Sequence, residues 1–194
     1  GRRGMGCPVE IEFAVDLPFN GEDKKEFALL QIRPMAISRH DRAVDITEAD
    51  RITAFCYSSM ALGHGWDRSI SDIVFVCPDT FNPSQTVAIA KEIGLLNGRL
   101  VAANRKYLLA GPGRWGSADR WLGIPATWNE ISGVGAIVET RAADLNADPS
   151  QGSHFFHNIT SLGISYLNLV ENGKDFIDWR WLEALPVAGA TAHV

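Results

Sequence analysis

Residues 107–123 read YLLAGPGRWGSADRWLG, in which a short apolar run leads into a loop with glycines at positions 111, 113 and 116. This G-x-G-x-x-G spacing is the dinucleotide-binding fingerprint when the loop joins a strand to a long helix. The apolar run predicts the strand, and Glu139 stands at about the distance where that fingerprint expects a later acidic residue. Gly123 and Pro125, however, limit any following helix to about two turns. A dinucleotide-binding domain is therefore an alternative that we hold open and do not favour.

Two further interpretations fit the same loop. In the first, it is a Gly/Pro turn packed under nearby tryptophans, which are Trp115, Trp121 and Trp128. In the second, it is a small-anion site, because glycines let backbone N–H groups converge and Arg114 offers a guanidinium fork to carboxylate or phosphate. In that site Ser117 caps the following turn. The candidate binding residues of this second interpretation are Gly111, Gly113, Arg114, Gly116 and Ser117.

A second unusual segment, residues 148–158, reads DPSQGSHFFHN. Its two histidines, His154 and His157, offer two ligands where a metal site needs at least three, and the candidates for the third are Asp148, Asn158 and Glu139. The G-x-S-x-G motif of a hydrolase is missing. We favour polar loop residues packed beside two phenylalanines. If the segment is functional, we expect His154 to face the same pocket as Arg114 and to bind the same anion.

Bulk composition excludes several classes of protein. The 194 residues carry a net charge of −5, which argues against a nucleic-acid binder. No apolar stretch approaches the ~20 residues that span a bilayer, and no signal peptide opens the chain. Three scattered cysteines, Cys7, Cys56 and Cys77, form no C-x-x-C pair and predict reduced thiols in the cytoplasm.

Hydrophobic periodicity predicts alternating strands and helices. Strands are expected over residues 9–17 and 26–35 as an antiparallel hairpin, and then over 69–79, 106–111 and 133–141. Helices are expected over 45–63, starting at Thr47, and over 82–100, with a stop near Asn97-Gly98. A second hairpin is expected over 163–179, turning at Asn172-Gly173.

The first 35 residues carry a resemblance to a known family. Residues 6–17, GCPVEIEFAVDL, and residues 29–35, LLQIRPM, resemble the end of the ATP-grasp domain of phosphoenolpyruvate synthase and pyruvate phosphate dikinase. The resemblance implies that Glu12 and Gln31 bind Mg²⁺. It also implies that Arg33 contacts the phosphates of ATP and acts in catalysis.

The chemistry of these residues agrees with that role. A carboxylate and an amide oxygen on neighbouring strands are hard ligands that suit Mg²⁺. Arg33, two residues after Gln31, is expected on the same strand face, where it can neutralise phosphate charge. This assignment requires positions 12, 31 and 33 to lie together on one side of the paired strands.

The later segments GPGRWGSADRWLGIPATW and DPSQGSHFFHNITSLGISY are similar to the C-terminal region of bacterial phosphoenolpyruvate synthase-like proteins. We therefore predict an α+β protein. It has an antiparallel strand pair from an ATP-grasp domain in residues 1–37, a mixed-sheet α/β domain in residues 38–184, and a loose tail in residues 185–194.

The resemblance implies the C-terminal fragment of a cytoplasmic, ATP-dependent phosphotransferase that works with an upstream ATP-grasp domain. The fragment itself is expected to be inactive but to bind a small anion such as phosphate, pyruvate or phosphoenolpyruvate. The alternative is a non-catalytic regulatory or docking module. The open edges of the strand pair need cover from the second domain or from a second chain in a homodimer.

Overall fold

The computed structural model describes residues 2–5, 9–16, 26–34, 44–63, 65–117, 119–141, 159, 162–170 and 173–194. The chain divides into two compact units, Gly1–Arg39 and His40–Val194. Each unit is described by itself.

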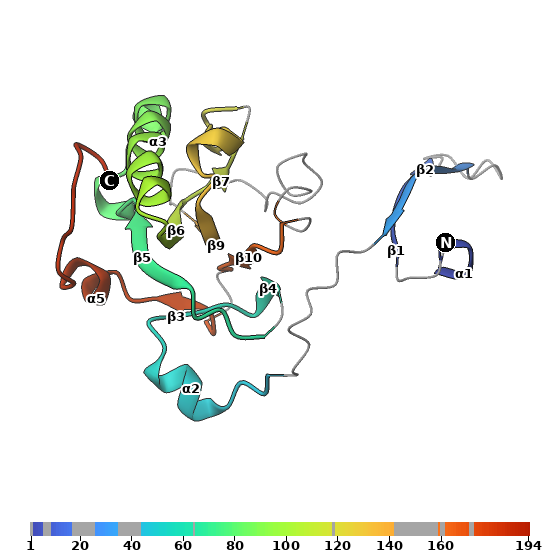
Figure 1. Ribbon diagram of the computed structural model, residues 1–194, viewed down its shortest axis with the longest axis horizontal. Helices are drawn as coiled ribbons and strands as arrows, with labels where there is room; N and C mark the ends of the chain where they lie inside the picture. Colours follow the sequence, from blue (N-terminus) through green and yellow to red (C-terminus); the bar gives the residue numbers. More distant parts are fainter. Residues whose placement is uncertain are drawn as a thin grey trace. The chain divides into compact units, whose positions relative to one another are not determined.

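The first unit is built on a two-stranded antiparallel ribbon, as the alternation of its sequence predicts. Strand β1 (Val9–Asp16) pairs with β2 (Glu26–Pro34), and the short helix α1 (Arg2–Met5) precedes them (Figure 1). The register is regular except for one irregularity next to Glu12.

The second unit is built on a five-stranded mixed sheet, in which four neighbouring strands are parallel and the fifth is antiparallel at one edge. In spatial order the strands are β4 (Met60–Leu62), β10 (Ser165–Asn168), β9 (Val134–Thr140), β6 (Lys106–Pro112) and β5 (Ile70–Phe75). The antiparallel ribbon and this mixed sheet confirm the predicted α+β class.

Apolar clusters cover both faces of the sheet. On one face, Ile89 and Ile93 of helix α3 (Thr86–Ala102) share a buried cluster with Ile137 of β9 (Figure 1). On the other face, Val138 belongs to a second cluster with residues of β11 (Phe176–Ile177) and α5 (Trp179–Glu183). All of β9 is buried as a result, which is typical of a central parallel strand.

Helix α3 runs further than predicted, through Asn97 and Gly98 to Ala102. Asn97 does not end the helix, because its side chain is buried and hydrogen-bonded inside the protein. The helix ends instead before Asn104, which has a left-handed backbone with φ of 52°.

The helix predicted over residues 45–63 is much shorter in the structure. Thr47 is the N-cap of helix α2 (Glu48–Thr53), as predicted, and its side chain forms a capping box with Asp50. The chain then forms two short strands, β3 (Cys56–Tyr57) and β4, which pair with β11 and β10. Because α2 buries none of its side chains, tertiary packing does not extend it, and strand pairing takes the residues that follow.

The hairpin predicted over residues 163–179 is wrong. Gly173 has the positive φ of a turn, 72°, but the strands before and after it join different sheets. β10 pairs with β9 and β4, whereas β11 pairs with β3. Alternating residues predict strands but do not identify their partners.

The remaining elements connect the sheet strands. Two short parallel strands follow β6, and three 3₁₀ turns lie in the connections. These elements are β7 (Arg114–Trp115), β8 (Gly123–Ile124), η1 (Pro78–Thr80), η2 (Pro83–Gln85) and η3 (Trp128–Glu130).

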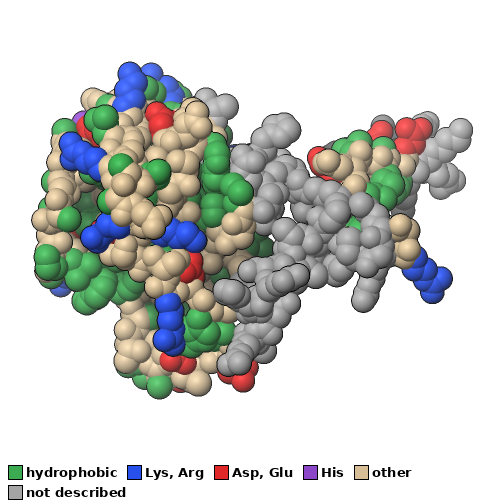
Figure 2. Space-filling view, in the orientation of Figure 1, with side chains coloured by type: hydrophobic (Ala, Val, Ile, Leu, Met, Phe, Trp, Pro, Cys, Tyr) green, Lys and Arg blue, Asp and Glu red, His purple; other side chains and the backbone are tan. Residues whose placement is uncertain are grey.

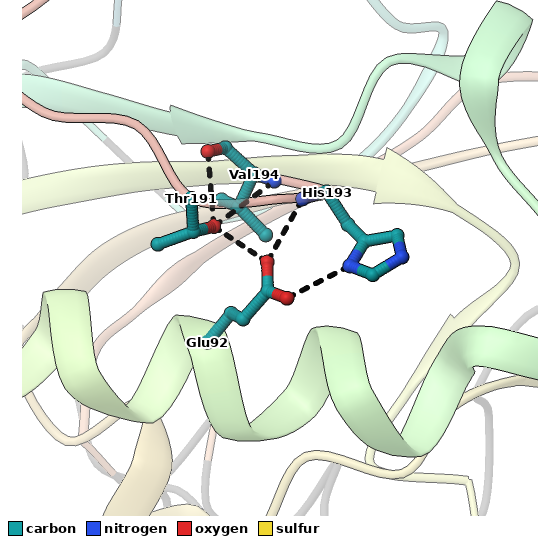
Figure 3. Close-up of polar contacts among 4 residues, drawn as sticks. All are labelled: Glu92, Thr191, His193 and Val194. Atoms are coloured by element: carbon teal, nitrogen blue, oxygen red, sulfur yellow. Dashed lines mark hydrogen bonds and ion pairs between the residues drawn. The ribbon is translucent and has the colours of Figure 1, made fainter.

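The end of the predicted loose tail is held against α3 (Figure 3). One carboxylate oxygen of Glu92 accepts from the Thr191 hydroxyl at 2.5 Å and from the His193 backbone N–H at 2.9 Å. The other oxygen lies 2.7 Å from Nδ1 of His193, and Val194 packs against the buried cluster beside α3. We call this set of contacts the C-terminal clasp. It corrects the prediction of a loose tail for its last four residues.

None of the described helices is long and apolar enough to cross a lipid bilayer. Cys56 and Cys77 are free thiols, and Cys7 lies outside the described residues.

Candidate functional site

The ribbon places the predicted metal ligands opposite each other. Glu12 is the cross-strand partner of Gln31, and Glu10 is the partner of Arg33. Directly opposed positions share a face of an antiparallel pair, and so do positions two residues apart. Positions 10, 12, 31 and 33 therefore lie on one face. The side chains of Glu12 and Gln31 are exposed, whereas those of Glu10 and Arg33 lie outside what the structure describes.

A β-bulge in β2 produces this arrangement. Glu12 pairs with Gln31 but Phe13 pairs with Leu29, so Leu30 has no cross-strand partner. One extra residue shifts the alternation of a strand by one position. Without it, Gln31 would lie on the same face as Leu29.

The opposite face of the ribbon is apolar. The Phe13 and Phe27 rings stack there, with their centroids 5.3 Å apart. Apolar side chains of the ribbon are exposed at its surface (Figure 2). By register and alternation, this face carries Ile11, Phe13, Val15, Phe27, Leu29 and Ile32. The ribbon thus separates an apolar face from the face of the predicted ligands.

The N–H groups of the glycine loop are used by the chain itself. Gly113, Arg114 and Gly116 donate their backbone N–H groups to backbone carbonyls at 2.8, 3.1 and 2.9 Å. Trp115 donates its backbone N–H to Oε1 of Glu139 at 3.0 Å. In this structure these four groups are therefore not available to a bound anion, contrary to the cradle that the sequence predicts. The Ser117 hydroxyl is bonded to the backbone of Asp119, as a turn cap would be.

Packing explains the glycines of this loop. A Cβ atom on Gly111 would lie 2.8 Å from the Trp115 ring, and one on Gly123 would lie 2.0 Å from the carbonyl oxygen of Arg114. Gly113 and Gly116 have positive φ angles of 74° and 71°. These observations favour the tight turn packed on Trp115. In the described part of the segment that follows, β8 and a 3₁₀ turn stand where a dinucleotide fold needs a long helix.

Glu139 is a buried carboxylate that the sequence suggested only for the dinucleotide-binding alternative and as a third metal ligand. It is 3% exposed, near the end of β9, and its Oε2 accepts from the Tyr166 hydroxyl at 2.5 Å. Together with the bond from Trp115, this contact joins the glycine loop, β9 and β10 at one carboxylate. The sequence signal for a buried carboxylate was the single acidic residue in the otherwise apolar stretch GVGAIVET.

Two further buried polar residues end the same strands, and their hydrogen bonds are incomplete. Thr140 is 8% exposed, and its Oγ1 has no partner in the described part of the chain. Asn168 is also 8% exposed, and its amide reaches the Tyr166 hydroxyl only at 3.5 Å. We call Glu139, Thr140 and Asn168 the carboxyl-end cluster.

Asn97 is a contrasting buried polar residue near the amino ends of the strands. Its Oδ1 accepts from the Tyr107 hydroxyl at 3.0 Å and from the Gly133 N–H at 2.9 Å. Its Nδ2 donates to the Asn129 carbonyl and the Ser132 hydroxyl, both at 3.2 Å. A carboxamide has two donor and two acceptor positions, so every one is used. We call this network the Asn97 hub.

His154 and the rest of the segment over residues 148–158 lie outside the described residues, so their predicted role stays a prediction. Within the described ranges, no three His, Cys, Asp or Glu side chains are grouped to hold a metal ion. Comparison of the chain with models of protein families, with curated proteins and with solved structures gave no match.

Proposed function

We propose that the β1–β2 ribbon carries metal and phosphate ligands of an ATP-dependent phosphotransferase that resembles phosphoenolpyruvate synthase. The observation that carries this proposal is the register, in which Glu12 faces Gln31 and Glu10 faces Arg33.

The residues fit a magnesium ion. Cross-strand partners have Cβ atoms about 4.5–5.5 Å apart, and Mg²⁺ binds oxygen at about 2.0–2.1 Å, so one ion can contact the side-chain oxygens of both Glu12 and Gln31. Mg²⁺ keeps few protein ligands and completes its shell with water and substrate phosphate. Arg33, two positions after Gln31, would then pair with a phosphate of ATP. When bound, Mg²⁺ supplies charge neutralisation for phosphoryl transfer.

Paramagnetic Mn²⁺ in place of Mg²⁺ tests this proposal in the full chain. With ATP present, Mn²⁺ should broaden the amide NMR signals of Glu12 and Gln31 first. Glu12→Gln should weaken Mn²⁺ binding by about tenfold, since it removes a charged ligand. Glu26→Gln is the matched control, because Glu26 is an exposed acid at the other end of β2. Equal effects of the two substitutions, or broadening that avoids both residues, would reject the proposal.

A further inference from the structure

The carboxyl-end cluster lies where open parallel sheets bind ligands. β5, β6, β9 and β10 are parallel neighbours, so their carboxyl ends meet at one edge of the sheet. In such sheets ligands bind outside the carboxyl ends of the strands. Glu139, Thr140 and Asn168 occupy the last two positions of β9 and the last position of β10.

Thr140 has an incomplete set of hydrogen bonds, unlike the other buried polar side chains of the residues that the structure describes. Buried polar groups in folded proteins nearly always have partners, because a buried donor or acceptor without one is destabilising. The Asn97 hub meets that rule at all four positions, and buried Thr86 is bonded to the carbonyls of Pro83 and Arg120. Among the described residues, the buried Oγ1 atom of Thr140 has no hydrogen-bond partner. A polar ligand would supply the missing bond.

Charge at this edge restricts the chemistry of the ligand. The Glu139 carboxylate disfavours a group that only accepts hydrogen bonds and favours a hydroxyl or ammonium group. Arg114 follows β6 at the same edge, since the register pairs Pro112 with Thr140, and its positive charge favours an acidic ligand at this edge. Thr140 and Asn168 can each donate and accept.

We propose that the carboxyl ends of β9 and β10 bind a small carboxylic acid that carries a hydroxyl or amino group on carbon 2. Thr140 and Asn168 hydrogen-bond the ligand, and Glu139 selects its donor group. Successive side chains leave a strand on opposite faces, so a ligand that meets both Glu139 and Thr140 extends across the strand ends. This site lies in the second unit and does not depend on the function proposed for the ribbon.

Three acids with one carbon skeleton test the proposal. L-lactate, L-alanine and pyruvate differ only in the hydroxyl, ammonium or oxo group on carbon 2. Titrated into the full chain, lactate or alanine should shift the amide NMR signals of residues 139–141 and 168–169. Pyruvate should bind about tenfold more weakly, because its oxo group donates no hydrogen bond.

Two isosteric substitutions separate binding from folding. Thr140→Val removes a hydroxyl that has no bond within the described protein, so the chain should fold normally and bind the favoured acid about tenfold more weakly. Thr86→Val removes a bonded hydroxyl and should leave the affinity unchanged. The proposal is overturned if none of the three acids shifts these signals, if pyruvate binds as tightly as the other two, or if Thr140→Val binds like the unmodified chain.

Discussion

The two ends of the parallel sheet treat buried polar groups differently. Near the amino ends, Asn97 uses both donors and both acceptors of its carboxamide, joining α3 to residues before β9 and to Tyr107 of β6. At the carboxyl ends, Asn168 makes one side-chain contact at 3.5 Å in the described residues, and Thr140 Oγ1 makes none there. Both asparagines are buried, with Asn97 4% exposed and Asn168 8% exposed.

The difference indicates separate roles for the two ends. A buried polar group with all its bonds fixes the packing of the elements around it, whereas one with missing bonds destabilises the fold unless something else binds it. The amino-end network therefore holds the sheet and α3 together. At the carboxyl ends, we infer that Thr140 and Asn168 keep hydrogen-bonding capacity for a ligand.

The largest predicted effect compares the two asparagines. Asn97→Ala should lower the free energy of unfolding by about 3–4 kcal/mol, because it breaks four hydrogen bonds and leaves the buried Tyr107 hydroxyl without its acceptor. Asn168→Ala should lower it by about 1 kcal/mol, because only one long contact is lost. Urea unfolding of both variants measures the two values. Similar losses of unfolding free energy in the two variants would mean that the two ends of the sheet do not differ in how their buried polar groups are bonded.

The C-terminal clasp is a second saturated network, and its stability should depend on pH. Burial raises the pKa of Glu92, but hydrogen bonds from Thr191 and His193 outweigh it and hold the pKa below its ordinary value of 4.5. The contribution of the carboxylate is therefore complete above pH 4.5 and is lost as the pH falls through the lower value in the folded chain.

Glu92→Gln tests this dependence. The variant should be less stable than the unmodified chain by about 1–2 kcal/mol at neutral pH, and the difference should shrink below pH 4.5. Urea unfolding of both chains across this pH range gives the difference. A gap that stays constant into acid would show that the carboxylate does not hold the clasp.

The smallest predicted effect is at Gly98. It tests whether α3 tolerates a substitution next to Asn97 when no hydrogen bond is lost. Gly98 follows Asn97, is exposed, and a Cβ atom there would meet nothing within 4 Å. Gly98→Ala should therefore raise stability by about 0.5–1 kcal/mol. Gly94→Ala is the control, because its Cβ would lie 2.9 Å from Cγ of Glu130 and should remove that gain. Thermal unfolding separates the two, and a loss at Gly98 would point to strain in the helix.

The sequence predicted the long elements because their periodicity is strong. The strands around residues 107 and 134 and most of α3 were correct in type and position. The elements that failed are short, and their state depends on partners far away in the chain, as when residues 60–62 join β10 rather than extend α2. Propensity alone does not encode such pairing.

The candidate sites were predictable to different degrees. The residue types on β1 and β2 suggested that Glu12 and Gln31 act together, but the bulge at Leu30 that places them on one face has no clear sequence signal. Glu139 was visible as an acid within an apolar strand. The sequence did not show that Asn97 makes all its hydrogen bonds while Thr140 Oγ1 makes none in the described residues, because hydrogen bonding depends on the folded chain.

The central claim is that the carboxyl ends of the sheet hold polar groups for a ligand rather than for stability. The free energies of unfolding of Thr86→Val and Thr140→Val, measured without ligand, test it most directly. We predict a loss of about 1–2 kcal/mol for Thr86→Val, whose hydroxyl contacts two carbonyls at 3.2 Å, and no loss or a small gain for Thr140→Val. A loss at Thr140 as large as that at Thr86 would show that its hydroxyl is bonded within the protein, and would contradict the account.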